Sequence, residues 1–139
     1  MIEARQLLAE KNPGAALLLA MKVQFLGMSF ASKLLMFMNP TAAVVYDSVI
    51  ARYLQAGSFG SLGWLANDPK SQNRRAQSGV YDNWCAYCID TANEMNRHGS
   101  EWIDWDGSRQ VWRAVDVERA VFALAGRDGA PESQITLTA

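Results

Sequence analysis

The chain has 139 residues, of which 50% are hydrophobic and 19% are charged, and its formal net charge at pH 7 is −1. This length and composition are those of one packed globular domain, and they exclude a disordered or low-complexity protein. Nucleic-acid-binding proteins usually carry a basic surplus, so the near-neutral charge counts against a broad basic surface and leaves room for a local one.

The amino-terminal segment predicts neither export nor membrane insertion. The first five residues include an acid, Glu3, and no long apolar run follows directly, unlike a secretory signal peptide. The apolar stretch 15–21 is too short to span a bilayer. Two cysteines, Cys85 and Cys88, are too few for a disulfide framework. We therefore expect a cytoplasmic protein with no membrane partner.

Two helices are expected before residue 27. Residues 2–11 have the apolar spacing of an amphipathic helix, and the sequence Asn-Pro-Gly at 12–14 ends it. Residues 15–25 are almost all apolar and predict a second helix in the centre of the fold. Gly27 is expected to break that helix.

Two shorter helices are expected next. Ser29 is a good N-cap for a third helix, which Asn-Pro at 39–40 ends because a residue before proline avoids helical angles. Asp47 is placed at the start of a fourth helix, which runs to about Gln55.

The second half of the chain predicts two more helices. A glycine-rich loop at 57–64 precedes a long helix at 75–98, and an Asp-Gly turn at 106–107 separates this helix from a last one at 114–125. We expect an all-α fold, a compact bundle of about six helices. The predicted domain is 1–126 and the predicted flexible tail 127–139. The apolar stripe of the long helix comprises Val80, Tyr81, Trp84, Cys88, Ile89, Ala92 and Met95.

The stretch 25–53 is almost wholly apolar, yet it contains one lysine, Lys33, and one acid, Asp47. A buried charge is costly unless it is paired or neutralised, so an ionisable group in apolar surroundings is a candidate functional residue. Lys33 and Asp47 are therefore the two primary site candidates.

In this stretch a glycine precedes a lysine that opens an apolar helix, an Asn-Pro break follows, and an Asp-x-x-apolar-x-Arg pattern comes next. This order of residues resembles the helix-hairpin-helix DNA glycosylases, most closely the 8-oxoguanine DNA glycosylase branch and its shorter bacterial relatives. The resemblance implies a DNA repair enzyme that removes a damaged base, with lyase activity through a Schiff base. The residues that carry it are Gly27, Lys33, Asn39, Pro40, Asp47, Ile50 and Arg52.

By this resemblance, Lys33 is the nucleophile and Asp47 assists at the sugar. A lysine must be deprotonated to attack C1′, and burial among apolar groups favours that form. Asp47 would stabilise the positive charge that grows on the sugar. Each residue also has a structural interpretation: the Lys33 stem lies along the core with its head in water, and Asp47 is a helix N-cap.

A further set of residues is expected to contact DNA, through the hairpin turn, through phosphates or through a tryptophan that wedges into the duplex. The alternative is that the basic side chains are only solvated and that the tryptophan packs on the core. The candidates are Gly27, Ser29, Arg52, Trp64, Lys70, Arg74 and Arg75.

No metal or cofactor is expected. Cys85 and Cys88 supply two ligands and His98 is the single histidine, whereas a structural zinc needs four ligands. Three functions stay open: a glycosylase acting on lesion-containing DNA, a non-catalytic relative that binds nucleic acid or a nucleoside-like ligand, and a structural or protein-interaction domain. The sequence leaves the recognised base and the oligomeric state undetermined.

Overall fold

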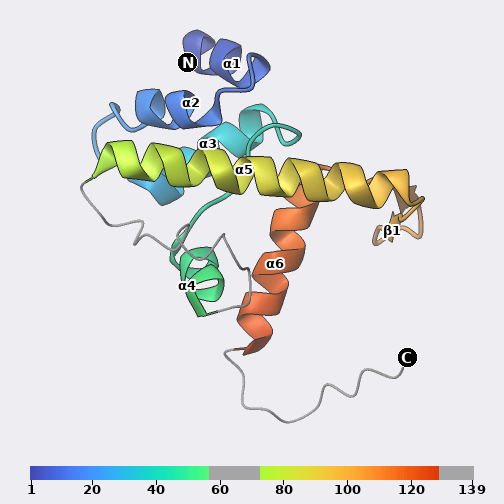
Figure 1. Cartoon of the computed structure of the whole chain (residues 1–139). Helices are drawn as coiled ribbons and strands as arrows, with labels where there is room; N and C mark the ends of the chain where they lie inside the picture. Colours follow the sequence, from blue (N-terminus) through green and yellow to red (C-terminus); the bar gives the residue numbers. More distant parts are fainter. Residues whose placement is uncertain (57–72, 129–139) are drawn as a thin grey trace.

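A computed structural model of the chain describes residues 1–56 and 73–128. These residues form six helices and a small two-stranded ribbon (Figure 1), so the prediction of an all-α bundle is confirmed. The helices are α1 (Ile2–Ala9), α2 (Pro13–Ala20), α3 (Met28–Met38), α4 (Ser48–Ala56), α5 (Arg74–Arg97) and α6 (Ala114–Asp128), and the strands are β1 (Trp102–Ile103) and β2 (Arg109–Gln110).

The long helix α5 crosses the molecule, with α1 and α2 on one side and α4 and α6 on the other (Figure 1). It packs against α2 and α6, and α3 packs against α2. The predicted stripe of α5 lies in the core, since apolar residues at helical spacing share one face. Val80, Tyr81, Trp84, Cys88 and Ala92 are buried, while Ile89 and Met95 are half-buried.

The second helix begins and ends earlier than expected. Pro13 occupies its first turn, where a missing N–H costs nothing, and Asn12 caps it by accepting from the Ala15 N–H at 3.3 Å. The prediction that this helix reaches residue 25 is wrong, because it ends at Ala20. Phe25 takes a left-handed φ of 69°, which no right-handed helix contains.

The expected cap of α3 is also corrected. Gly27, not Ser29, is the N-cap, and its carbonyl accepts the first intrahelical bond from the Ala31 N–H at 2.9 Å. Ser29 lies inside the first turn of the helix. The predicted end of α3 at Met38, before the Asn-Pro sequence, is confirmed.

The ribbon between α5 and α6 was not predicted as strands. Its turn contains Gly107, whose φ of 83° suits glycine and whose N–H donates to the Asp104 carbonyl at 2.9 Å. The side chain of Asn96 then holds the Trp112 backbone, donating to its carbonyl and accepting from its N–H, each at 2.8 Å. These bonds position the chain just before α6.

The last helix is longer than expected. Gly126 was predicted to end it, but α6 continues to Asp128, since one glycine near a helix end costs only about 1 kcal/mol. The predicted boundary between domain 1–126 and tail 127–139 therefore cuts through the final turn of α6. Residues 129–139 lie outside the described part, so the flexible tail stays a prediction.

Candidate functional site

A buried segment, residues 43–46, lies between α3 and α4 and is held by side chains rather than by a sheet. Buried backbone groups need hydrogen-bond partners, and α5 supplies two of them. The Tyr81 hydroxyl donates to the Val44 carbonyl at 2.8 Å, and the Trp84 indole N–H donates to the Val45 carbonyl at 2.9 Å. The segment is thus fixed against the centre of the molecule.

Helix α3 holds the end of the same segment through Ser32, which is fully buried. The Ser32 hydroxyl oxygen accepts from the Tyr46 N–H at 3.0 Å, and the hydroxyl donates to the Ser29 carbonyl at 2.9 Å. Ser32 directly precedes Lys33 and Tyr46 directly precedes Asp47. One hydrogen bond therefore sets the backbones of the two primary candidates relative to each other.

Lys33 is half-buried on α3, one turn after Phe30. Its amine lies 5.4 Å from the centre of the Phe30 ring, within the range of a cation–π contact. The Phe30 side chain is 65% exposed, so this contact lies at the surface of the protein. The Lys33 amine is therefore placed beside an aromatic ring that solvent also reaches.

Asp47 begins α4, as predicted. Its Oδ1 accepts from the Val49 N–H at 3.0 Å and from the Ile50 N–H at 3.1 Å, the bonding pattern of a helix N-cap. Both cap bonds use Oδ1, so the second carboxylate oxygen takes no part in the cap. The structural interpretation of Asp47 is thus confirmed, and a catalytic role stays compatible with it.

A third ionisable group, Glu118 on α6, is affected by the charges of both Asp47 and Lys33. Glu118 is only 5% exposed. Burial and then the negative charge of Asp47 raise its pKa from 4.5 to about 7, while Arg119 and Lys33 act in the opposite direction. We call Lys33, Asp47 and Glu118 the ionisable cluster. Three helices, α3, α4 and α6, contribute to it.

The sequence analysis missed Glu118. Its position carries a signal nonetheless, because Ala114, Val117 and Val121 are buried residues of α6 and Glu118 falls at helical spacing within their stripe. Phe122 and Leu124 of the same helix are 43% and 46% exposed, outside this stripe. An ionisable residue among apolar ones is also the pattern that singled out Lys33 and Asp47.

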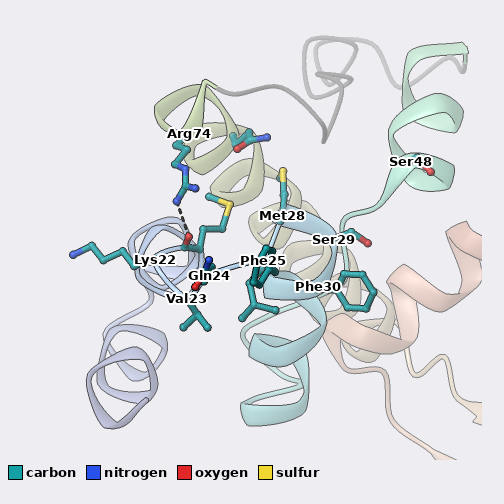
Figure 2. Close-up of a pocket in the computed structure, with 13 residues that line it drawn as sticks. Lys22, Val23, Gln24, Phe25, Met28, Ser29, Phe30, Ser48 and Arg74 are labelled. Atoms are coloured by element: carbon teal, nitrogen blue, oxygen red, sulfur yellow. Dashed lines mark hydrogen bonds between the residues drawn. The ribbon is translucent and has the colours of Figure 1, made fainter.

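A surface pocket of about 690 Å³ is lined by neighbours of two members of the cluster (Figure 2). Its wall includes Phe30, which contacts Lys33, and Ser48, which follows Asp47. Lys33 and Asp47 themselves are outside the lining. The pocket is formed by the turn between α2 and α3, the first turn of α3 and the starts of α4 and α5. Its other lining residues are Met21, Lys22, Val23, Gln24, Phe25, Leu26, Gly27, Met28, Ser29, Arg74 and Gln77.

Two predicted DNA-contacting residues, Gly27 and Ser29, line this pocket. Arg74 lines it too, but its guanidinium donates to the Met21 carbonyl at 2.6 Å (Figure 2) and so ties α5 to the end of α2. Arg52 and Arg75 are exposed, as expected of residues that contact a phosphate or only solvent.

The other two DNA-contacting candidates, Trp64 and Lys70, lie outside the described residues. Their expected roles stay predictions.

The two cysteines, Cys85 and Cys88, are both fully buried. Burial raises the pKa of Cys85 to about 12 and also raises the pKa of Cys88, so both stay as thiols at neutral pH. Within residues 1–56 and 73–128, no three His, Cys, Asp or Glu side chains form a group that would hold a metal ion.

Comparisons with protein-family models, with curated proteins and with solved structures give no match for this chain. No helix of the described residues has the length and apolar character needed to cross a membrane.

Proposed function

We propose that the protein is a DNA glycosylase of the helix-hairpin-helix type that removes a damaged or modified base through a Schiff base on Lys33. The observation that carries the proposal is the ionisable cluster: a lysine and two acids from three helices, beside an open pocket. Lone ionisable groups in apolar surroundings concentrate at functional sites.

In this proposal the Lys33 amine attacks C1′ of the damaged nucleotide, and the base leaves. The positive charge that develops on the sugar is stabilised by Asp47, which the N-cap bonds hold in place. The exposed Phe30 ring beside Lys33 offers an apolar surface for the sugar or base. In this proposal Asp47 acts from its N-cap position, and Lys33 acts from its position beside the Phe30 ring.

Binding to DNA would rest on few contacts. The net charge of −1 provides no general attraction to phosphate, so Lys22 on the pocket wall and the exposed Arg52 and Arg75 are the described candidates for that role. Weak binding that decreases steeply with salt is the expected result. The base that is recognised is left open by this site.

The test is reductive trapping. An imine between Lys33 and the ring-opened sugar is reduced by borohydride to a stable amine, so incubation with lesion-bearing duplexes should leave a covalent protein–DNA adduct. Lys33→Gln removes the amine, shortens the side chain by one atom and should abolish the adduct. Lys11→Gln is the matched control, because Lys11 is exposed and belongs to a turn far along the chain from the cluster.

The adduct should map to Lys33 by peptide mass analysis, and it should form faster with one damaged base than with a plain abasic site. The position of the adduct must be determined because other lysines also react slowly with abasic sites. Equal yield from Lys33→Gln, or no adduct from the wild type with any oxidised or alkylated base, would reject the glycosylase and favour a non-catalytic nucleic-acid-binding protein.

A further inference from the structure

The ribbon between α5 and α6 presents apolar side chains to solvent. Trp105 at its turn is 93% exposed, and Ile103 in β1 and Val111 after β2 are exposed as well. Apolar residues that gather on one exposed element commonly mark a contact surface, and tryptophan contributes more than most residues to such contacts. The proposed glycosylase site makes no use of this ribbon.

Hydrogen bonds hold the ribbon in this shape, so the exposure of Trp105 is a property of the fold. The Trp105 N–H donates to Asp104 Oδ1 at 2.8 Å, and the Asp104 N–H donates to the Ser108 carbonyl at 2.9 Å. The Trp102 indole N–H also donates to the Val111 carbonyl at 3.2 Å. A segment whose shape is fixed before binding loses little conformational entropy when it meets a partner.

The ribbon is acidic. It carries three acids, Glu101, Asp104 and Asp106, against a single base, Arg109, which is itself paired with Glu101 at 3.4 Å. Hydrogen bonds from the hydroxyl and the N–H of Ser108 lower the pKa of Asp106, so this carboxylate at the turn stays charged at neutral pH. A partner that fits the ribbon therefore offers an apolar surface with basic residues at its edge.

The pocket of about 690 Å³ has this composition. The exposed side chains of Val23, Phe25 and Phe30 line it, and its charged lining residues are Lys22 and Arg74. Figure 2 shows Lys22 and Phe30 at opposite edges of the pocket. No acid is among the described residues that line it. The charge of the pocket is thus opposite to that of the ribbon.

The ribbon and the pocket of one chain lie at opposite ends of α5. Arg74, the first residue of α5, lines the pocket, whereas the ribbon follows the last turn of the helix (Figure 1). A helix of 24 residues is about 36 Å long, so the ribbon does not reach the pocket of its own chain. A second copy whose α5 runs antiparallel to the first brings the ribbon of each copy to the pocket end of the other.

We propose that the protein forms a two-fold symmetric dimer in which the ribbon of each copy enters the pocket of the other. Trp105 packs against the apolar wall that includes Phe25 and Phe30, and the Asp106 carboxylate faces the Lys22 ammonium. A two-fold axis makes the two contacts identical and closes the assembly at two copies. The pocket is open in the monomer and filled in the dimer, whatever reaction the protein catalyses.

The first test is sedimentation velocity of the full chain from about 5 µM to about 500 µM. The wild type should pass from monomer to dimer over this range. Trp105→Ala should raise the dimer dissociation constant at least about tenfold, because it removes the apolar anchor from both contacts. Phe37→Ala is the matched control: Phe37 is also a largely exposed aromatic residue, but it is not among the described residues of the pocket lining, and its removal should change nothing.

Exchanged charges identify the two surfaces that meet. Lys22→Glu and Asp106→Lys should each be mostly monomeric at a concentration at which the wild type is dimeric, since like charges then face each other. An equimolar mixture of the two variants should restore the dimer, because every ribbon of the mixed pair meets a pocket of opposite charge. Lys11→Glu, at another exposed lysine, should behave like the wild type.

A wild type that stays monomeric over the whole range would overturn the proposal, as would oligomers larger than a dimer. A Trp105→Ala variant that dimerises as well as the wild type would do the same. If the mixture of folded Lys22→Glu and Asp106→Lys proteins fails to dimerise, the ribbon does not meet the pocket and the proposal is wrong. None of these measurements uses reductive trapping, so failure of the dimer leaves the proposed glycosylase function standing.

Discussion

Ser32 on α3 accepts a hydrogen bond from the backbone N–H of Tyr46 at 3.0 Å, and both residues are fully buried. Each precedes a member of the ionisable cluster, Lys33 or Asp47. Because a serine hydroxyl is short and the bond is buried, the spacing between the two backbones has little freedom. A packed structural residue thereby sets the geometry of the candidate site.

Ser32→Ala tests this relationship. It leaves the buried Tyr46 N–H without its acceptor, and the free energy of unfolding should fall by about 1–3 kcal/mol. The trapping rate should fall as well, since the spacing of Lys33 and Asp47 is no longer fixed. Denaturant unfolding measures the first effect, with Ser78→Ala on α5 as a control expected to change stability by less than about 0.5 kcal/mol. Equal stability of the two variants would contradict this account.

The bond between Tyr81 and the Val44 carbonyl gives a second test. Burial raises the pKa of Tyr81 well above 10.0, so its hydroxyl stays protonated and donates across the whole range in which the protein is folded. Tyr81→Phe removes only this hydroxyl and leaves a buried carbonyl unpaired. Urea unfolding should show a loss of about 1–3 kcal/mol. An unchanged midpoint would mean that the Ala43–Tyr46 segment is not held in this way.

Gly14 tests the contact between α2 and α5. Its N–H donates to Asp82 Oδ1 at 2.6 Å, and a Cβ placed on it would lie 2.3 Å from the carboxylate. Gly14→Ala should therefore lower stability by about 1–3 kcal/mol, since the contact must open. Gly79→Ala in the interior of α5 meets nothing within 4 Å and should instead raise stability by about 0.5–1 kcal/mol. Thermal unfolding of both variants tests this expectation. Stability changes of the same sign in Gly14→Ala and Gly79→Ala would contradict the described contact between α2 and α5.

Glu118 should make stability depend on pH. Its pKa is raised from 4.5 to about 7 in the folded protein, so the folded state holds this proton more tightly than the unfolded state. The resulting stabilisation is complete below pH 4.5 and is lost as the pH rises through about 7, by roughly 3 kcal/mol at most.

Unfolding free energies of the wild type and Glu118→Gln, measured from pH 4.5 to pH 8, check this expectation. The stability of the wild type relative to the variant should fall steadily over that range. A constant difference between the two proteins would show that Glu118 has an ordinary pKa in the folded state.

Asp47→Asn separates capping from charge. Asparagine is also a good N-cap, so the free energy of unfolding should change by less than about 0.5 kcal/mol, whereas Asp47→Ala should cost about 1 kcal/mol. Base release should fall roughly a hundredfold in Asp47→Asn, because the charge that stabilises the sugar cation is gone. A large loss of stability with full activity would make Asp47 a purely structural residue.

The sequence by itself determined most of the local structure. The apolar stripe of α5 predicted that helix to within one residue at each end, and Asn-Pro predicted the end of α3 at Met38. Asp47 was correctly placed at the start of α4. These features depend on residues a few positions apart, so capping preferences, proline geometry and helical spacing are enough to predict them.

The sequence also marked Lys33 and Asp47, because a charge in an apolar stretch is visible without coordinates. Only the tertiary structure decided what lies around them. Glu118 joins the cluster because α6 packs against α4, and Ser32 meets Tyr46 because the chain turns back after α3. Arg74 likewise bonds to the Met21 carbonyl, directly after α2, from far along the chain. Such contacts join residues that are distant in sequence. They cannot be predicted from the spacing of residues along the chain, because they depend on how the helices pack.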